Sequence, residues 1–290
     1  MQSLQNYITI QGLNLSSKII LASLLASQIL LSAESQSSKI PEFNPKIATH
    51  CLIKHYNPLN LEAQNVLRFK GQNISWNLQS KSIETPTALT YQKDLKNAQL
   101  VDSFTFPYPL GKFAKMPYED SSRIRDITLF SHLYGANEKE VKQHLKPLVW
   151  LDGTEILFNT KNGAYDALKR VKNHLEKLID SNPYLRIYLQ NIGGTFKWRK
   201  IANSQNISAH SFGIAIDINV ANSRYWLWDL RNQTLSDSQS VATIPLEIIE
   251  AFENENFIWG GRWWHYDTMH FEYRPEILCY AKKLSSLNTF

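Results

Sequence analysis

The sequence has few cysteines and none of the cysteine spacings that usually identify a structural zinc site. Its 290 residues include only Cys51 and Cys279, which lie far apart and outside any CxxC or Cys/His pattern. This scarcity argues against a cysteine-ligated metal. In an oxidising compartment the two residues can form a disulfide, whereas two buried thiols are an equally good alternative, so the sequence leaves their pairing open.

Two common hydrolase motifs are also missing. The sequence contains neither the HExxH motif of thermolysin-type zinc peptidases nor the GxSxG motif that presents a catalytic serine. Neither cysteine is next to a plausible base, so nucleophilic catalysis has no identifiable nucleophile. Any catalytic chemistry must therefore come from residues that are separated along the chain.

Dense basic clusters are absent, although the chain is basic overall. The formal net charge is +5 and the isoelectric point is about 9.0, which favours anionic partners such as nucleic acid, anionic lipid or a wall polymer. Basic stretches such as "KWRK" (197–200) are short, and no C2H2 or RNP-type motif occurs. We therefore expect no nucleic-acid partner.

Only one apolar run is long, and it is too short to span a bilayer comfortably. "IILASLLASQILL" (19–31) follows Lys18 and precedes small residues, as in an export signal. We interpret residues 1–33 as a signal peptide, or as a membrane anchor if they are not cleaved; a buried core helix is the alternative. The expected location is the periplasm or cell envelope, with membrane contact only through an uncleaved N-terminal segment.

The rest of the chain divides into a polar segment and a patterned one. Residues 34–99 are rich in Asn, Ser, Gln and Pro, and we interpret them as an irregular N-terminal extension. Residues 100–290 carry regular hydrophobic patterns and are predicted to form one domain. The patterns predict helices within 121–134 and from 137, a hairpin over 149–158, a helix over 164–179, a strand over 185–192 and a helix over 244–257. This order favours an α+β domain with a mainly antiparallel sheet and flanking helices.

One stretch with a candidate carboxylate is "SAHSFGIAIDINV" (208–220). Isoleucines alternate with Ala215, Asp217 and Asn219, as in a strand with one buried face. His210 precedes Asp217 by seven residues, and Gly213 allows a tight backbone between them. An imidazole and a carboxylate can therefore converge on one point.

A second stretch, "GRWWHYDTMHFEY" (261–273), supplies further polar candidates. Its last five residues alternate, which places His270 and Glu272 on one face and leaves Asp267 at the entrance of the strand. Two imidazoles and one carboxylate are a recurrent catalytic zinc set, with water in the fourth position. A nearby carboxylate that does not bind the metal can accept a proton from that water, a role that suits Asp267.

These two stretches resemble a known family. "SAHSFGIAIDIN" and "FIWGGRWWHYDTMHFEYRPE" are similar to the zinc D-alanyl-D-alanine carboxypeptidases and L-alanyl-D-glutamate endopeptidases of bacterial cell-wall metabolism, which include VanY-like enzymes and phage endolysins. In that family a SxHxxGxAxD motif and a later carboxylate-x-x-His motif form the site. The resemblance extends through "GTFKWRKI" (194–201) and "NGAYDAL" (162–168), more loosely "DSSRIRDITLFSHLYG" (120–135), and covers about residues 100–281. It implies a hedgehog/DD-peptidase-like fold.

The resemblance also implies roles for individual residues. The implied zinc ligands are His210, Asp217 and His270. Asp267 would be the general base; many carboxypeptidases of the group have Glu there, so the aspartate leans toward endopeptidase chemistry. Arg199 occupies the place of an arginine near the substrate carboxylate, a task that suits a guanidinium fork.

Further residues are expected around the ligands rather than on the metal. Ser208, the serine of the motif, would donate or accept hydrogen bonds beside the ligands. His265 has no clear counterpart in the family and is interpreted, with the neighbouring tryptophans, as part of the pocket wall, since a fourth protein ligand would close the position that catalysis needs. Glu272 is expected to orient His270 or to be structural.

The family resemblance, together with these motifs, implies a zinc metallopeptidase that acts on the stem peptides of peptidoglycan. The sequence leaves open whether the D-Ala-D-Ala or the L-Ala-D-Glu bond is cut. The alternative from another class of protein is a zinc-containing cell-wall binding module without catalytic activity. An intact Asp267 and Arg199 count against that alternative, because a binding module has no use for a base.

Overall fold

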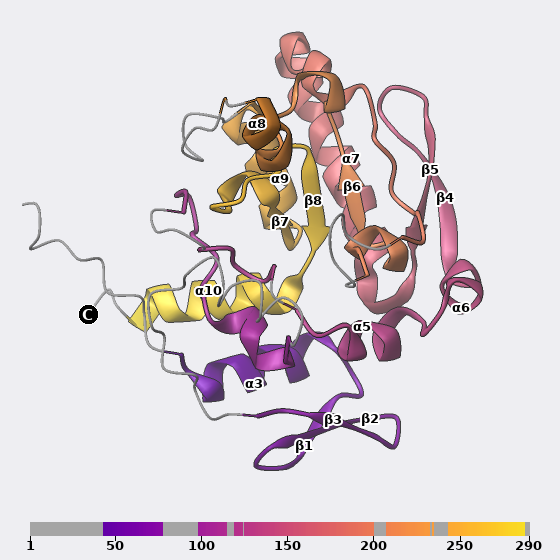
Figure 1. Cartoon of the computed structure of the whole chain (residues 1–290). Helices are drawn as coiled ribbons and strands as arrows, with labels where there is room; N and C mark the ends of the chain where they lie inside the picture. The colour runs from indigo at the N-terminus through magenta and orange to yellow at the C-terminus, as the bar shows by residue number, and fades with distance from the viewer. Residues whose placement is uncertain are drawn as a thin grey trace, which may run out of the picture. The chain divides into compact units, whose positions relative to one another are not determined.

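The computed structural model describes residues 43–77, 98–114, 119–123, 125–199, 207–232, 234 and 243–287, which belong to one compact unit, Pro41–Phe290. Helices and antiparallel strands are mixed, which confirms the α+β class (Figure 1). The finer hedgehog/DD-peptidase-like fold stays a prediction. The expected signal peptide or anchor, residues 1–33, lies outside the described residues. Among the helices that are described, none has both the length and the apolar character needed to cross a membrane.

A small antiparallel sheet lies at the centre of the domain. Its strand order is β6 (Ala215–Asp217), β8 (His270–Tyr273), β7 (Phe257–Trp259). The middle strand, β8, is buried along its whole length, and Phe271 stacks on Phe252 with ring centroids 4.0 Å apart. The predicted alternation in "MHFEY" is therefore confirmed for the core face. The predicted strand around Asp217 is also present, although it is only three residues long.

Helices and a hairpin pack around this sheet. Helix α7 (Ala164–Ser181) buries one face, which includes Leu168, Val171 and Leu175, and it contacts α9 (Leu246–Asn254). The hairpin of β4 (Leu145–Val149) and β5 (Glu155–Asn159) turns at Gly153, whose φ of 87° favours glycine. The sequence predicted both helices and the hairpin correctly.

Two short helices precede the hairpin. Helix α5 (Ile127–Tyr134) ends at Gly135, and α6 (Glu138–Lys142) begins after Asn137, whose side chain accepts a hydrogen bond from the Glu140 amide. Both the predicted helix end at Gly135 and the predicted N-terminal cap at Asn137 are therefore confirmed. The remaining short elements are η1 (Leu100–Phe104), η2 (Lys161–Gly163), η4 (Ala209–Phe212), η5 (Val220–Asn222), α8 (Trp226–Asn232) and η6 (Gly260–Arg262).

The predicted strand over 185–192 is wrong. This segment begins with a 3-10 helix, η3 (Pro183–Leu189), in which Leu185 and Leu189 are buried. Proline suits the first turn of a helix, which is where Pro183 lies. The apolar residues of "LRIYL" were assigned to a strand because a short apolar run has no clear period.

The prediction that the polar segment is irregular is also wrong for its described part. It forms helix α3 (Pro45–His55) and an antiparallel sheet of β1 (Asn60–Ala63), β2 (Val66–Phe69) and β3 (Gln72–Ser75). Trp76, fully buried, meets Phe104 edge to face, and Phe104 meets Tyr280 in the same way. The segment therefore contributes to the core. Its few apolar residues are spread among exposed polar ones, so that no periodicity is visible in the sequence.

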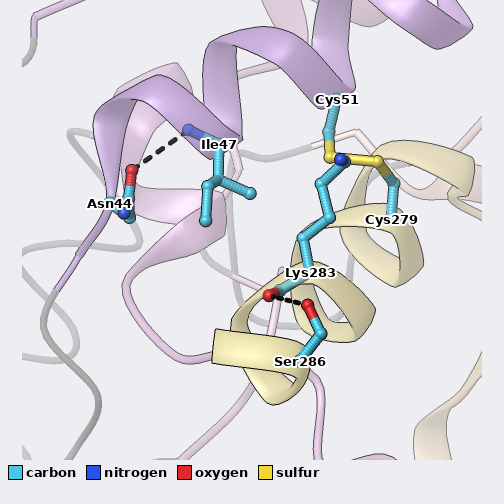
Figure 2. Close-up of a disulfide and its surroundings, with 6 residues drawn as sticks. All are labelled: Asn44, Ile47, Cys51, Cys279, Lys283 and Ser286. Carbon is cyan, nitrogen blue, oxygen red and sulfur yellow. Dashed lines mark hydrogen bonds between the residues drawn. A yellow bond between two sulfur atoms is a disulfide. The ribbon is translucent and has the colours of Figure 1, made fainter. Parts of the chain in front are cut away.

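The two cysteines connect this segment to the C-terminal helix. Helix α3 lies alongside α10 (Pro275–Leu287), as Figure 1 shows, and the two helices make many contacts. Cys51 on α3 and Cys279 on α10 form a disulfide, with their Cα atoms 5.7 Å apart (Figure 2). The N-terminal cap of α3, Asn44, lies near the same contact and accepts a hydrogen bond from Ile47. Of the two alternatives for the cysteines, the structure contains the disulfide.

Candidate metal centre

Two of the predicted ligands are brought together by strand pairing. Asp217 on β6 is directly opposite His270 on β8 in the antiparallel register. Directly opposed residues point to the same face of a sheet with their Cβ atoms about 5 Å apart. Asp217 Oδ1 consequently lies 3.0 Å from His270 Nδ1. The short sheet thus holds a carboxylate and an imidazole side by side on rigid backbone.

The third predicted ligand comes from the turn that leads into β6. His210 lies in η4, which is flanked by the cap residues Ser208 and Gly213; φ at Gly213 is 63°. The Ser208 hydroxyl accepts a hydrogen bond from the His210 amide at 3.3 Å, so it caps the helical turn. His210 Nε2 reaches 3.1 Å from Asp217 Oδ1 and 3.2 Å from His270 Nδ1. The motif serine and glycine therefore shape the turn that positions His210.

The outer nitrogen of each imidazole has its own partner. His210 Nδ1 is 2.9 Å from the Thr195 carbonyl oxygen, and His270 Nε2 is 3.0 Å from Glu272 Oε2. A ring nitrogen that donates to such an acceptor leaves the other nitrogen as the metal-binding lone pair. The other two nitrogens, His210 Nε2 and His270 Nδ1, both face Asp217. The bonds to Thr195 and Glu272 favour a proton on His210 Nδ1 and on His270 Nε2, so that His210 Nε2 and His270 Nδ1 are the atoms left to bind a metal.

Glu272 belongs to a buried ion network beneath the centre. Arg125 Nη1 and Arg274 Nη1 each donate to a different oxygen of Glu272 at 2.8 Å. Arg274 also donates to Glu276 at 2.6 Å, and Glu276 accepts from the Tyr56 hydroxyl at 2.6 Å. Removal of one member of such a network leaves an uncompensated buried charge. Glu272 therefore orients His270 from a rigid position, and the network continues to the end of α3.

The charges at the centre shift the protonation of the ligands. Burial raises the pKa of Asp217, but the adjacent His210 and His270 outweigh burial and hold that pKa far below its usual range. Burial lowers the pKa of His270, yet the hydrogen bonds to Asp217 and Glu272 raise it to about 10. In the metal-free protein His270 is thus a cation, and a metal ion must displace its proton on binding.

The donor set suits a single metal ion. His210, Asp217 and His270 offer one ligand atom each, all within 4.8 Å of one another. Two imidazole nitrogens and one carboxylate oxygen match a three-ligand catalytic zinc site, in which the fourth position is taken by water or substrate. The outer hydrogen bonds of both imidazoles are those expected around a bound metal. The residues therefore fit the metal that the sequence resemblance implies.

Asp267, the predicted base, lies beside the centre without entering the ligand set. Its carbonyl oxygen accepts from the His270 amide at 3.2 Å. Its Oδ1 is shielded from solvent and has no hydrogen-bond partner among the described residues. Burial raises the pKa of this carboxyl to about 6, despite the nearby positive charge of His270. A carboxyl poised near neutrality with an unsatisfied oxygen has the properties of a general base.

A cavity of about 310 Å³ opens over these residues. Its lining combines the candidate metal-binding triad of His210, Asp217 and His270, and Asp267, with aromatic and cationic groups: Arg123, Arg199, Tyr225, Trp228 and Trp263. Arg199 has an exposed side chain, while its carbonyl oxygen accepts hydrogen bonds from the Ser208 amide at 3.1 Å and the Ser211 hydroxyl at 2.9 Å. The structure therefore brings Arg199 and Ser208 to the same cavity as the triad.

His265, which the sequence predicts as part of the pocket wall, is not among the residues that line this cavity, although the neighbouring Trp263 is. Its Nδ1 lies 2.5 Å from Asp120 Oδ2, and its backbone amide donates to the other oxygen of Asp120 at 2.8 Å. The ring packs against Trp226 with centroids 4.4 Å apart. His265 is thus engaged by Asp120 and Trp226 rather than by the triad.

Sequence reasoning missed four residues at this site: Asp120, Arg123, Arg125 and Tyr225. The first three come from one stretch, "DSSRIR" (120–125), which lies more than 140 residues before His265 and Glu272, the residues that it contacts. Only the looser part of the family resemblance pointed to this stretch. Tyr225 carries no motif signal.

The donor triad and its adjacent carboxylate fit the pattern of a single-metal hydrolase site. In a comparison with family models, residues 202–273 are similar to the model described as D-alanyl-D-alanine carboxypeptidase. The match includes the triad and Asp267, and it confirms the resemblance drawn from the sequence. It implies a peptidase of a family that acts on peptidoglycan peptides. Searches of curated proteins and of solved structures gave no match.

Proposed function

We propose that this protein is a zinc metallopeptidase that hydrolyses a peptide bond in the stem peptide of peptidoglycan. The observation that carries the proposal is the triad of His210, Asp217 and His270 next to Asp267, whose Oδ1 has no partner among the described residues. The family match over residues 202–273 supports the same chemistry. The bond cut is either D-Ala-D-Ala or L-Ala-D-Glu.

In the proposed mechanism the triad holds zinc and Asp267 moves the proton. A bound zinc ion supplies Lewis acidity, which lowers the pKa of a water molecule toward about 7. Asp267, ionised at neutral pH, accepts a proton from the attacking water. Its carboxyl then returns that proton to the leaving amine, so that the carboxylate is regenerated. Glu272 and the Thr195 carbonyl keep the two imidazoles in place throughout.

Arg199 is proposed to hold a carboxylate of the stem peptide. Its side chain is exposed in the cavity, while its backbone is fixed by Ser208 and Ser211. A planar guanidinium binds a carboxylate through two parallel hydrogen bonds. Both candidate bonds place a carboxylate near the leaving group, and the net charge of +5 favours such an acidic substrate.

A location outside the cytoplasm, in the periplasm or cell envelope, is part of the proposal. The disulfide between Cys51 and Cys279 supports it, since such bonds persist mainly in oxidising compartments. The apolar segment at 19–31 supports it independently.

The test is a digestion of purified muropeptides followed by mass spectrometry. We expect the wild-type protein to release terminal alanine or to split after the first alanine, to stop when a chelator is added and to recover with zinc. Asp267→Ala is expected to bind zinc normally and to lose activity by about 10²- to 10⁴-fold, the usual contribution of a general base.

Asp180→Ala, at the exposed end of α7, is the matched control and should retain full activity. Zinc binding without hydrolysis by the wild-type protein would favour the non-catalytic binding module instead. Equal activity of Asp267→Ala and wild type would refute the role of Asp267.

A further inference from the structure

Tyr225 lies at the entrance of α8 and lines the cavity over the metal centre. Its ring packs edge to face on Trp228 with centroids 5.6 Å apart, and Trp228 lines the same cavity. The amides of Trp228 and Asp229 both donate to the Tyr225 carbonyl oxygen, at 2.9 and 3.1 Å. The backbone of Tyr225 is therefore fixed by the first turn of the helix.

Strand-like pairing aligns Tyr225 with Asp267. The two residues form an isolated antiparallel bridge, and the flanking Trp226 amide donates to the Tyr266 carbonyl at 3.0 Å. Opposed residues of an antiparallel pair project their side chains to the same face. Both residues line the cavity. The phenol is thus on the same side as the proposed base and the metal-binding triad.

The cavity that Tyr225 lines also contains the charged side chains of Arg123, Arg199 and Asp267. Burial raises the pKa of the Tyr225 hydroxyl, while the positive charge of Arg123 and a hydrogen bond from it act in the opposite direction. The carboxylate of Asp267 raises the pKa, and Arg199 lowers it. The two arginines and Asp267 act on the phenol from the same cavity that Tyr225 lines.

Arg123 is itself held in a defined position. Its Nη1 donates to the His265 carbonyl oxygen at 2.7 Å, and its guanidinium lies over the Trp263 ring at 5.2 Å from the centroid. When the phenol oxygen accepts a hydrogen bond from Arg123, the phenol hydrogen can point to another acceptor, and the donated bond polarises it. A neutral, polarised donor is thereby fixed beside the base.

We propose that the Tyr225 hydroxyl is a catalytic residue that donates a hydrogen bond to the carbonyl oxygen of the scissile peptide bond. This inference rests on the proposed function and adds a residue to it. As the water oxygen bonds to the carbonyl carbon, the carbonyl oxygen becomes an oxyanion, and the bond from Tyr225 strengthens. The C–N bond then breaks and the amine takes the proton carried by Asp267. Tyr225 keeps its own proton throughout.

Such a donor acts on the rate rather than on substrate binding. A preorganised donor aimed at a developing oxyanion typically contributes about 10²- to 10³-fold to kcat. A residue that only forms the cavity wall would contribute equally to substrate and transition state, and its loss would change KM. The two roles are therefore separable by kinetics.

The test compares Tyr225→Phe with wild type in the full-length, zinc-loaded protein on the muropeptide that wild type cleaves best. The phenylalanine keeps the ring and its contact with Trp228 and removes only the hydroxyl. We expect kcat to fall by about 10²-fold with KM within about 3-fold of wild type. Calorimetry should show a similar loss of affinity for a phosphinate analogue of the stem peptide, which mimics the tetrahedral intermediate.

Tyr273→Phe is the matched control, since this tyrosine is on β8 and donates to the Asn162 carbonyl at 3.1 Å, in the core. It should alter stability and leave kcat and analogue affinity unchanged. Zinc content and melting temperature are measured for every variant. A kcat for Tyr225→Phe within 3-fold of wild type, or a loss confined to KM, would overturn the inference. If wild type cleaves no muropeptide, the proposed function itself fails.

Discussion

His270 contacts two carboxylates, one on each ring nitrogen, and they act in different ways. Asp217 lies opposite His270 across the sheet and shares the metal-binding side, whereas Glu272 is on the same strand and has no exposed surface. Because Arg125 and Arg274 neutralise Glu272, it can accept from His270 without taking the proton. A single imidazole is thus oriented by a network that extends away from the cavity.

The proposed base sets the pH dependence of the reaction. Burial raises the pKa of Asp267 to about 6 in the metal-free protein, and a nearby dication lowers it. Since the base must be ionised, kcat/KM is expected to rise with pH and to level off by about pH 6 to 7. Measurement of kcat/KM from pH 4 to 8 in zinc-buffered solution checks this. A midpoint of the acidic limb well above pH 7 would contradict the role of Asp267.

For individual residues, the sequence predicted the site residues that lie within a recognisable motif and missed the site residues that lie outside one. His210, Asp217, His270 and Asp267 lie in two stretches whose alternation and spacing are visible in the sequence. The role of Glu272 was left open, because it depends on Arg125, which is 147 residues away in the chain. Pairings over such separations have no periodicity to reveal them.

The elements that carry the site are short, so neighbouring segments must fix their positions. Strand β6 has three residues, and the backbone of 193–195 runs beside it. The Gly193 amide donates to the Asp217 carbonyl at 2.9 Å, and the Asp217 amide donates to the Gly194 carbonyl at 3.2 Å. The Thr195 carbonyl then meets His210. One glycine-containing segment thus supports two of the three ligands.

Gly193→Ala is expected to weaken metal binding. A Cβ atom at this position would lie 2.7 Å from Val220 Cγ2 and 3.0 Å from Asp217 Cβ, so that either the ligand or the segment must shift. Loss of such support typically costs about 10- to 100-fold in metal affinity. Competition titration with a zinc chelator measures the affinity.

Gly153→Ala in the hairpin turn is the contrasting control. A Cβ there would meet nothing within 4 Å, but its φ of 87° strains any other residue. The variant should therefore lose about 1 kcal/mol of unfolding free energy and keep its zinc affinity. Unchanged zinc affinity in Gly193→Ala would contradict the supporting role of the segment.

Long helices and strands were predicted from the sequence more accurately than short ones. The helix at 164–181 has several turns of consistent periodicity and was predicted nearly to its ends. The segment at 183–189 contains two buried leucines, a pattern compatible with a strand or a helical turn, and its conformation is decided by packing against α7. Short segments thus depend on tertiary contacts that the sequence does not display.

At the scale of the whole molecule, the N-terminal segment is joined to the region that carries the site. Helix α3 packs on α10, the disulfide connects them, and Tyr56 closes the ion network that reaches His270 through Glu276, Arg274 and Glu272. The sequence predicts this segment as a separate extension, because its apolar residues are sparse. The apolar residues of α3 are buried because they pack against α10, and this contact between distant parts of the chain cannot be recognised in the sequence.

Replacement of both cysteines by serine is expected to destabilise the protein. Loss of a native disulfide usually costs about 2–5 kcal/mol, largely through the greater freedom of the unfolded chain. Urea denaturation of the double variant, and of wild type with and without reductant, measures the change. The reduced wild type should match the double variant. Equal stability of oxidised wild type and variant would contradict this expectation.

The position of the disulfide also affects the order in which the protein can fold. Its cysteines are 228 residues apart, so α3 is synthesised long before the helix to which it bonds. The apolar face of residues 45–76 therefore has no partner helix until nearly all of the chain up to α10 has been synthesised. However, the chain has only two cysteines, so that oxidation within one molecule has a single possible product. Oxidative folding of this protein then requires an electron acceptor but no reshuffling of mispaired bonds.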